Sequence, residues 1–133
     1  VTDLEPLRRH RLFELRFSRN RVADLAPLTS HRQMRRLLFV DNRVTDLSPL
    51  AGLGRLTVVD LSLNRVVDLT PLARVPRLEQ IIALGNLIED LSPLLELEEL
   101  ELLILISNPL SRTAVNRQVP QLRDGGVEVV LDE

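Results

Sequence analysis

Five aspartates are the residues of this chain whose type and spacing first suggest metal chemistry. They recur once per repeat, at Asp3, Asp24, Asp46, Asp68 and Asp90. A calcium site needs six or more oxygen ligands that converge on one point, whereas one carboxylate per repeat forms a column. We therefore interpret each aspartate as an acceptor for turn N–H groups or as the partner of an arginine. The candidate arginines lie in Asn-Arg-Val segments, at Arg21, Arg43 and Arg65.

The two histidines give a weak case for a zinc site. His10 and His31 each follow a proline by four residues, and later repeats carry Leu53, Val75 and Leu97 at that position. Without cysteine or converging carboxylate ligands, we predict that both are partly buried substitutes for core residues. Neither lies at a recognisable motif spacing from a serine nucleophile, cysteine is absent, and there is no glycine-rich phosphate loop. The sequence therefore predicts no enzyme, no cofactor and no metal.

A repeat of constant length must position every other side chain. It is marked by five asparagines, each 22 residues after the last, at Asn20, Asn42, Asn64, Asn86 and Asn108. Each ends the pattern L-x-x-L-x-L-x-x-N, and such a period indicates one structural unit per repeat, stacked into a solenoid. Alternating apolar residues predict a short strand, and successive strands should form a parallel sheet with rungs about 4.8 Å apart. Because an asparagine amide both donates and accepts, the column should satisfy inward-facing backbone groups.

The second half of the repeat carries a family resemblance. The segment V-T-D-L-S-P-L at residues 44–50 returns with small changes at 22–28, 66–72 and 88–94, and an incomplete copy opens the chain at Val1. These copies resemble the 22-residue repeats of bacterial internalin-like leucine-rich repeat proteins. The resemblance covers essentially the whole chain. It implies an α/β leucine-rich repeat solenoid with short parallel strands on its concave side.

The convex side should carry a short helix or 3₁₀ turn in each repeat. Ser48-Pro49 and its equivalents place a hydroxyl, which we expect to cap the turn, before a proline suited to the first helical position. Leu50, Leu53 and Leu56 should then form the inward stripe.

We expect a solenoid of one partial and about five repeats over residues 1–108, and a C-terminal cap over 109–133. No polar cap precedes Val1, which suggests a fragment of a longer chain. In the cap, Ser111 should begin a helix that Pro120 kinks or splits. Its buried face is predicted to comprise Val115, Val119 and Leu122, with a last strand over 127–131. This segment resembles the C-terminal caps of bacterial leucine-rich repeat proteins.

Charge is divided along the chain. Residues 1–66 contain 12 arginines and 7 acidic residues, a balance of +5, and residues 67–133 contain 5 and 12, a balance of −7. We expect a dipole along the solenoid, with a basic end that could steer an acidic partner or bind phosphate. That end is defined by Arg8, Arg9, Arg11, Arg16, Arg19, Arg32, Arg35 and Arg36. The acid-rich half and the scarcity of aromatic residues argue against nucleic acid as the main partner, and no stretch is long enough for a membrane helix.

The concave sheet is the predicted functional surface, because strand residues between the core positions must point outward. Those residues are polar in the first repeat and aliphatic in the last, and they should form an apolar patch of roughly several hundred Å², the size of an interaction surface. The predicted partner-binding residues are Arg16, Arg36, Leu38, Val40, Val58, Asp60, Ile82, Leu84, Leu102, Ile104 and Ile106.

These residues predict a non-catalytic module that binds a protein through the concave sheet, with Arg16, Arg36 and Asp60 setting register. Two alternatives remain open. The chain could be a scaffold that dimerises through the same face, or an electrostatic module that uses its arginine-rich end on nucleic acid or an acidic surface.

Overall fold

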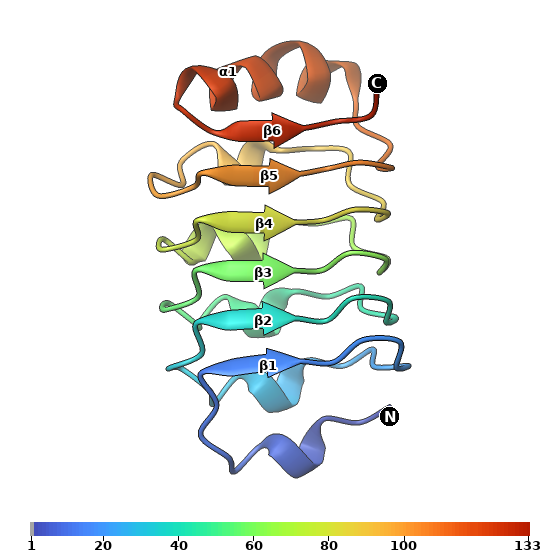
Figure 1. Ribbon diagram of the computed structural model, residues 1–133, viewed down its shortest axis with the longest axis vertical. Helices are drawn as coiled ribbons and strands as arrows, with labels where there is room; N and C mark the ends of the chain where they lie inside the picture. Colours follow the sequence, from blue (N-terminus) through green and yellow to red (C-terminus); the bar gives the residue numbers. More distant parts are fainter. Residues whose placement is uncertain (1) are drawn as a thin grey trace.

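The computed structural model describes residues 2–133 as a solenoid in which each repeat adds one rung to a parallel sheet (Figure 1). The six strands pair in chain order, and the two termini lie at opposite ends of the stack. The strands are β1 (Glu14–Arg16), β2 (Arg36–Leu38), β3 (Val58–Asp60), β4 (Gln80–Ile82), β5 (Leu102–Ile104) and β6 (Glu128–Val130). The predicted leucine-rich repeat solenoid is confirmed. Val1, the expected start of the incomplete first repeat, lies outside the described residues.

The register between strands repeats the sequence period without a slip. Glu14 pairs with Arg36, Arg36 with Val58, and the same offset continues to Leu102. One residue per rung therefore forms a column along the solenoid. Since side chains alternate between the two faces of a strand, each column is either buried or exposed along its length.

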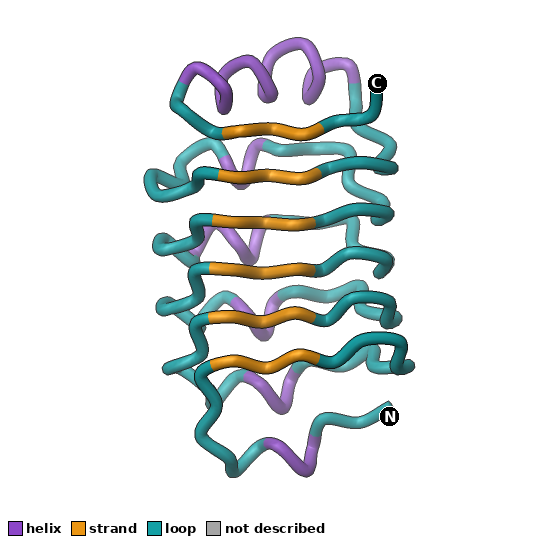
Figure 2. The backbone as a smooth tube through the Cα atoms, viewed as in Figure 1, coloured by secondary structure: helices purple, strands orange, loops and turns teal. Residues whose placement is uncertain are grey.

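Short 3₁₀ turns cover the side opposite the strands, as Figure 2 shows. Each has a proline in its first two positions, where the missing N–H leaves no helical hydrogen bond unmade. The turns are η1 (Glu5–Leu7), η2 (Ala26–Leu28), η3 (Ser48–Leu50), η4 (Thr70–Arg74) and η5 (Ser92–Leu94). Leu50, Leu53 and Leu56 are fully buried between turn and strand, so the predicted inward stripe is confirmed.

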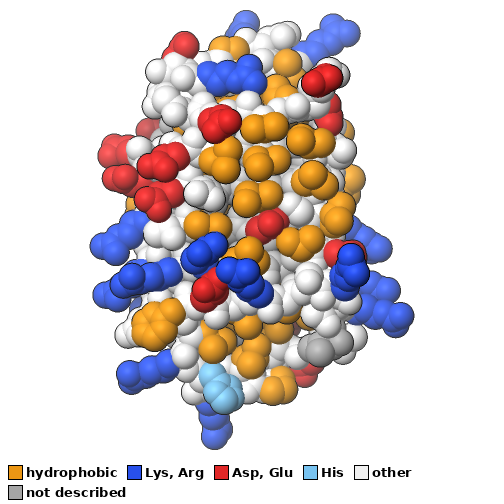
Figure 3. Space-filling model, in the orientation of Figure 1, with side chains coloured by type: hydrophobic (Ala, Val, Ile, Leu, Met, Phe, Trp, Pro, Cys, Tyr) orange, Lys and Arg blue, Asp and Glu red, His pale blue; other side chains and the backbone are white. Residues whose placement is uncertain are grey.

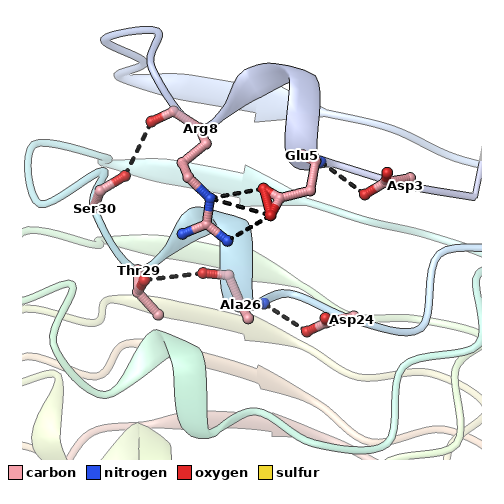
Figure 4. Close-up of polar contacts among 7 residues, drawn as sticks. All are labelled: Asp3, Glu5, Arg8, Asp24, Ala26, Thr29 and Ser30. Atoms are coloured by element: carbon pink, nitrogen blue, oxygen red, sulfur yellow. Dashed lines mark hydrogen bonds and ion pairs between the residues drawn. The ribbon is translucent and has the colours of Figure 1, made fainter.

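The aspartate column caps the turns, and this corrects one prediction. Asp24 Oδ1 accepts a hydrogen bond from the Ala26 N–H at 2.8 Å, and Asp3 does the same for Glu5 (Figure 4). The expectation that the serine hydroxyl caps its turn was wrong: the Ser48 hydroxyl donates to Asp46 at 3.0 Å instead. An aspartate two residues earlier reaches the first free N–H with better geometry and carries charge.

Neither alternative role of the column is realised in the part of the chain that the structure describes. Its carboxylates form no ion pair with arginine there, and no group of three or more potential metal ligands lies together. Neighbouring turns contact each other through other groups. The Ser30 hydroxyl donates to the Arg8 carbonyl at 3.1 Å across two turns, whereas the ion pair of Arg8 with Glu5, at 2.7 Å, lies within the first turn (Figure 4).

The asparagine column links each rung to the preceding one. Asn64 Oδ1 accepts from the Val44 N–H at 3.0 Å, and its Nδ2 donates to the carbonyls of Phe39 at 2.9 Å and Leu61 at 3.0 Å. Asn42 and Asn108 repeat all three hydrogen bonds in their own rungs. Asn86 repeats the two to the preceding rung and donates to the Leu84 carbonyl in its own, whereas the hydrogen bond described for Asn20 is to the carbonyl of Ser18. The ladder therefore satisfies buried backbone groups between consecutive repeats up to Asn108, and between β5 and β6 the carboxylate of Asp132 accepts from the Ser107 N–H instead.

A helical segment and β6 cover the last rung. Ser111 Oγ accepts from the Ala114 N–H at 3.0 Å, so the predicted capping serine is confirmed. The chain then forms a π-helix, η6 (Ala114–Gln118), before α1 (Val119–Asp124), which has Pro120 in its first turn. The predicted split into two turns was wrong, because helical residues run without a break from η6 into α1. Proline lacks the N–H of a helical hydrogen bond, and the helix changes from the π to the α pattern directly before it. The range 127–131 was too long for the last strand, which spans only Glu128–Val130.

The π-helix also changes which residues the cap buries. Ala114 is fully buried and Val115 is 43% exposed, so the predicted inward position of Val115 was wrong. The wider π turn, in which the Val119 N–H donates to the Ala114 carbonyl, rotates the buried face by one position. Val119 and Leu122 are buried as predicted. Within residues 2–133, no helix is long and apolar enough to cross a membrane.

The asparagine ladder generates a stability prediction. Asn64→Ala removes the partner of one buried N–H and of three buried carbonyls, those of Phe39, Leu61 and Ser62. It should lower the free energy of unfolding by about 1–3 kcal/mol. Asn20→Ala is the matched control, because it removes a single hydrogen bond. Chemical denaturation followed by circular dichroism measures both. Equal effects at the two positions would contradict the assigned role of the ladder.

The cap generates a second prediction, on pH. Hydrogen bonds from the Ser92 hydroxyl, from Gln118 and from the Ser92 N–H lower the pKa of Asp90 below its ordinary value of 3.8. A lowered pKa stabilises the fold above that ordinary value, and the stabilisation is lost as pH falls through the folded-state pKa. Asp90→Asn should therefore lower the melting temperature at neutral pH, and its difference from the unsubstituted chain should shrink in acid below about pH 4. A difference that is independent of pH would rule out this linkage.

Candidate functional site

The concave face of the sheet carries a group of partly exposed aliphatic side chains, which we call the aliphatic patch. They alternate along each strand with fully buried positions such as Leu37, Val59 and Ile81. Figure 3 shows hydrophobic side chains gathered over β3 to β5 and basic side chains over the rungs below them. The aliphatic patch comprises Leu38, Val40, Val58, Ile82, Leu84, Leu102, Ile104 and Ile106.

The strand register brings the patch residues together from different rungs. Ile82 pairs directly with Ile104, and Val58 and Leu102 lie on either side of Gln80 in the next column. The structure thus places all eight predicted aliphatic residues on one face, each partly exposed. No other described residue covers the exposed part of these side chains, so this surface is available for apolar contact.

Arg16 and Arg36, which were predicted to set register, share one carboxylate at the N-terminal border of the patch. Arg16 Nη2 lies 2.7 Å from Glu14 Oε1, and Arg36 Nε lies 3.9 Å from the same oxygen. The Arg16 hydrogen bond, followed by the charges of both arginines, lowers the pKa of Glu14. These exposed pairs contribute little to stability. Because two arginines share one carboxylate, the group keeps a net positive charge at the border of the patch.

Asp60, the third predicted polar residue, lies on the patch itself between Leu38 and Ile82. Its Oδ1 accepts from the Ser62 N–H at 3.0 Å, and the Ser62 hydroxyl accepts from the Leu84 N–H at 3.2 Å. The carboxylate is therefore fixed by the backbone of its own rung. A partner must offer a donor at this point or leave a charge without a partner.

A hollow of about 550 Å³ lies at the edge of the patch where the strands end, and sequence reasoning missed part of it. It is lined by Arg16, Phe17, Ser18, Arg19, Leu38, Val40, Asp41 and Leu63. Arg19, Asp41 and Leu63 precede the ladder asparagines, and all three have φ between 56° and 58°. This left-handed conformation turns the chain at the end of each strand. Gly85 occupies the same repeat position and also has a positive φ. Because glycine adopts this conformation without strain, it was the residue from which the sequence could have indicated the turn.

Leu63 is the most unusual residue of this hollow. A bulky side chain at positive φ is strained, yet Leu63 is 46% exposed. Its Cδ2 lies over Gly85, where an added Cβ would approach it to 2.7 Å. Gly85 thus makes room for a leucine that extends the apolar surface of the patch around the strand ends.

The two histidines meet at a separate, small hollow of about 180 Å³, which Ser30 also lines. His31 is 4% exposed and its Nε2 has no hydrogen-bond partner, so its predicted core position is confirmed. His10 is exposed, so its predicted partial burial was wrong. The difference arises because His31 has rungs on both sides of it, whereas His10 lies in the first turn that the structure describes.

Comparison with solved structures identifies the architecture. The structure matches internalin C2 of Listeria monocytogenes with a TM-score of 0.81 and 30% identity over 98% of this chain and 66% of that one. It matches a second L. monocytogenes internalin, inlF, with a TM-score of 0.67 and 22% identity over 100% of this chain and 47% of that one. For a leucine-rich repeat protein of Leptospira interrogans the TM-score is 0.78, with 24% identity over 86% and 30% of the two chains.

The strand register, the asparagine ladder and these similarities define a leucine-rich repeat solenoid. The chain belongs to the bacterial internalin-like leucine-rich repeat family. It spans about two thirds of internalin C2 and less than half of the other two proteins. No protein-family model matches the sequence, and a search of curated proteins also found no match.

The buried histidine generates a stability prediction. Replacing His31 by leucine, the residue at the equivalent position 53, removes an unsatisfied polar atom. His31→Leu should raise the free energy of unfolding by about 1–3 kcal/mol, whereas His10→Leu should have little effect because His10 is exposed. Thermal denaturation measures both. A destabilised His31→Leu variant would mean that the imidazole makes a contact essential to the fold.

Proposed function

We propose that this chain is a non-catalytic recognition module that binds a protein partner through its concave sheet. The observation that carries the proposal is the aliphatic patch, because eight aliphatic side chains remain partly exposed on one face. The curved inner surface of a solenoid is the surface that repeat proteins use for binding. Its columns offer apolar contact without any group arranged for chemistry.

The energetics favour a protein over a small ligand. Fully burying a leucine or isoleucine contributes roughly 1.5–3 kcal/mol before the costs of association. A partner must cover several rungs at once to gain this from the whole patch, which requires an extended protein surface. The Glu14 pairs at one border and Asp60 within the patch then select partners with matching donors and acceptors.

Paired substitutions test the proposal. Ile82→Asp with Ile104→Asp places two charges in the centre of the patch, and it should weaken binding to a purified partner by a factor on the order of 100 or more. The partner is obtained by photo-crosslinking from a probe residue at position 82, and its affinity is then measured by calorimetry. Circular dichroism checks that the double variant remains folded.

The matched control places the same charges elsewhere. Val67 and Val115 are 52% and 43% exposed and lie outside the concave face, so Val67→Asp with Val115→Asp should leave the affinity unchanged. Equal loss in both double variants would refute concave binding. If crosslinking instead captures a second copy of this chain, and light scattering shows a mass that rises with concentration, the function is self-assembly through the same face.

A further inference from the structure

A second surface lies on the flank of the solenoid just after the strand ends. Arg21, Arg43 and Arg65 each directly follow a ladder asparagine, and all three side chains are exposed. Each lies one rung from the next, because the asparagine ladder keeps the repeat in register. Rungs of a parallel sheet are about 4.8 Å apart, so three like charges form a closely spaced row. We call this row the arginine ladder.

Within residues 2–133 the arginine ladder forms no ion pair, although Asp41 lines the same hollow. The ion pairs that the structure shows for residues 2–133 join Glu5 to Arg8 and Glu14 to Arg16 and Arg36. The aspartate column, expected as one possible partner, bonds to turn N–H groups instead. Like charges at this spacing repel one another, more strongly where salt is low. An anionic ligand would remove that repulsion.

The arginine ladder lines a hollow that joins the concave face. This hollow, of about 350 Å³, is formed by Arg19, Asn20, Arg21, Asp41, Asn42, Arg43 and Arg65. Arg19 and Asp41 also line the larger hollow at the edge of the aliphatic patch. A partner on the concave sheet can therefore continue around the strand ends onto the arginine ladder without leaving the surface.

We propose that the arginine ladder binds an acidic segment of the protein partner, a stretch of several Asp or Glu residues next to its apolar contact region. This inference rests on the proposed function, since it names the chemistry of the same partner. A guanidinium group presents paired N–H donors that match a carboxylate. Three guanidinium groups in a row can bind successive carboxylates of the acidic segment. They would thereby set the direction in which the partner lies along the solenoid.

The arginine ladder ends at Arg65, and this short length favours an acidic polypeptide segment over a nucleic acid, which is charged along its whole length. The next residue in register after Arg65 is Leu87, which is 49% exposed. The flank therefore changes from basic to apolar within one rung, and residues 67–133 carry a balance of −7. A nucleic acid would meet this acidic half and would find no exposed aromatic side chain beside the arginine ladder for base stacking.

A labelled oligoglutamate peptide tests the proposal directly by fluorescence anisotropy at low ionic strength. Combining Arg21→Gln, Arg43→Gln and Arg65→Gln should weaken its binding about tenfold, as expected for the loss of three exposed ion pairs. The matched control combines Arg32→Gln, Arg55→Gln and Arg77→Gln. These exposed residues precede the strands and change the net charge equally, so the control should retain binding within about twofold.

Three outcomes would overturn the proposal: no binding of the peptide to the unsubstituted chain, equal weakening by the two triple variants, or tighter, ladder-dependent binding of a labelled oligothymidylate. The Ile82→Asp, Ile104→Asp variant separates this proposal from the previous one. It should bind oligoglutamate normally, because the arginine ladder lies off the patch. Loss of peptide binding only in the ladder variant supports the acidic segment even if the concave face proves not to bind a protein.

Discussion

Every rung of this solenoid turns its backbone into the interior after the strand, and the buried N–H and C=O groups there must find partners. The asparagine ladder supplies them: from Asn42 onward, each amide accepts from the preceding rung and donates to carbonyls of both rungs. A residue with only one hydrogen-bonding function could not do both. The repeat length is therefore held constant, since an insertion between two asparagines would separate an amide from its partners.

Constant register converts a linear sequence into columns, and both proposed binding surfaces follow from this. A column one position from a buried strand residue faces the concave side in every rung, so the aliphatic patch needs only the choice of isoleucine, leucine or valine at those positions. The residue after each asparagine lies on the flank in every rung, so three arginines there become neighbours. Neither surface requires a special loop, because the scaffold provides the spacing.

The 3₁₀ turns that complete each rung use the same three residue types in every repeat. A proline is the second residue of each 3₁₀ turn, a leucine occupies the cap position, and an aspartate two residues before the turn accepts its first free N–H. The Asp90 turn also binds Gln118 of the C-terminal helical segment. The last repeat is thereby connected to the residues that cover it by the same carboxylate that closes its own turn.

The sequence by itself determined the fold, the columns and the eight aliphatic patch residues, because strand alternation and repeat period are local properties repeated in five copies. The tertiary structure alone decided which charges are left without partners and how surfaces meet at the strand ends. The burial of His31 and the exposure of His10 depend on whether rungs lie on both sides. The position of Leu63 depends on a positive φ and on space above Gly85. Such features arise from distances across rungs, and residue spacing does not encode those distances.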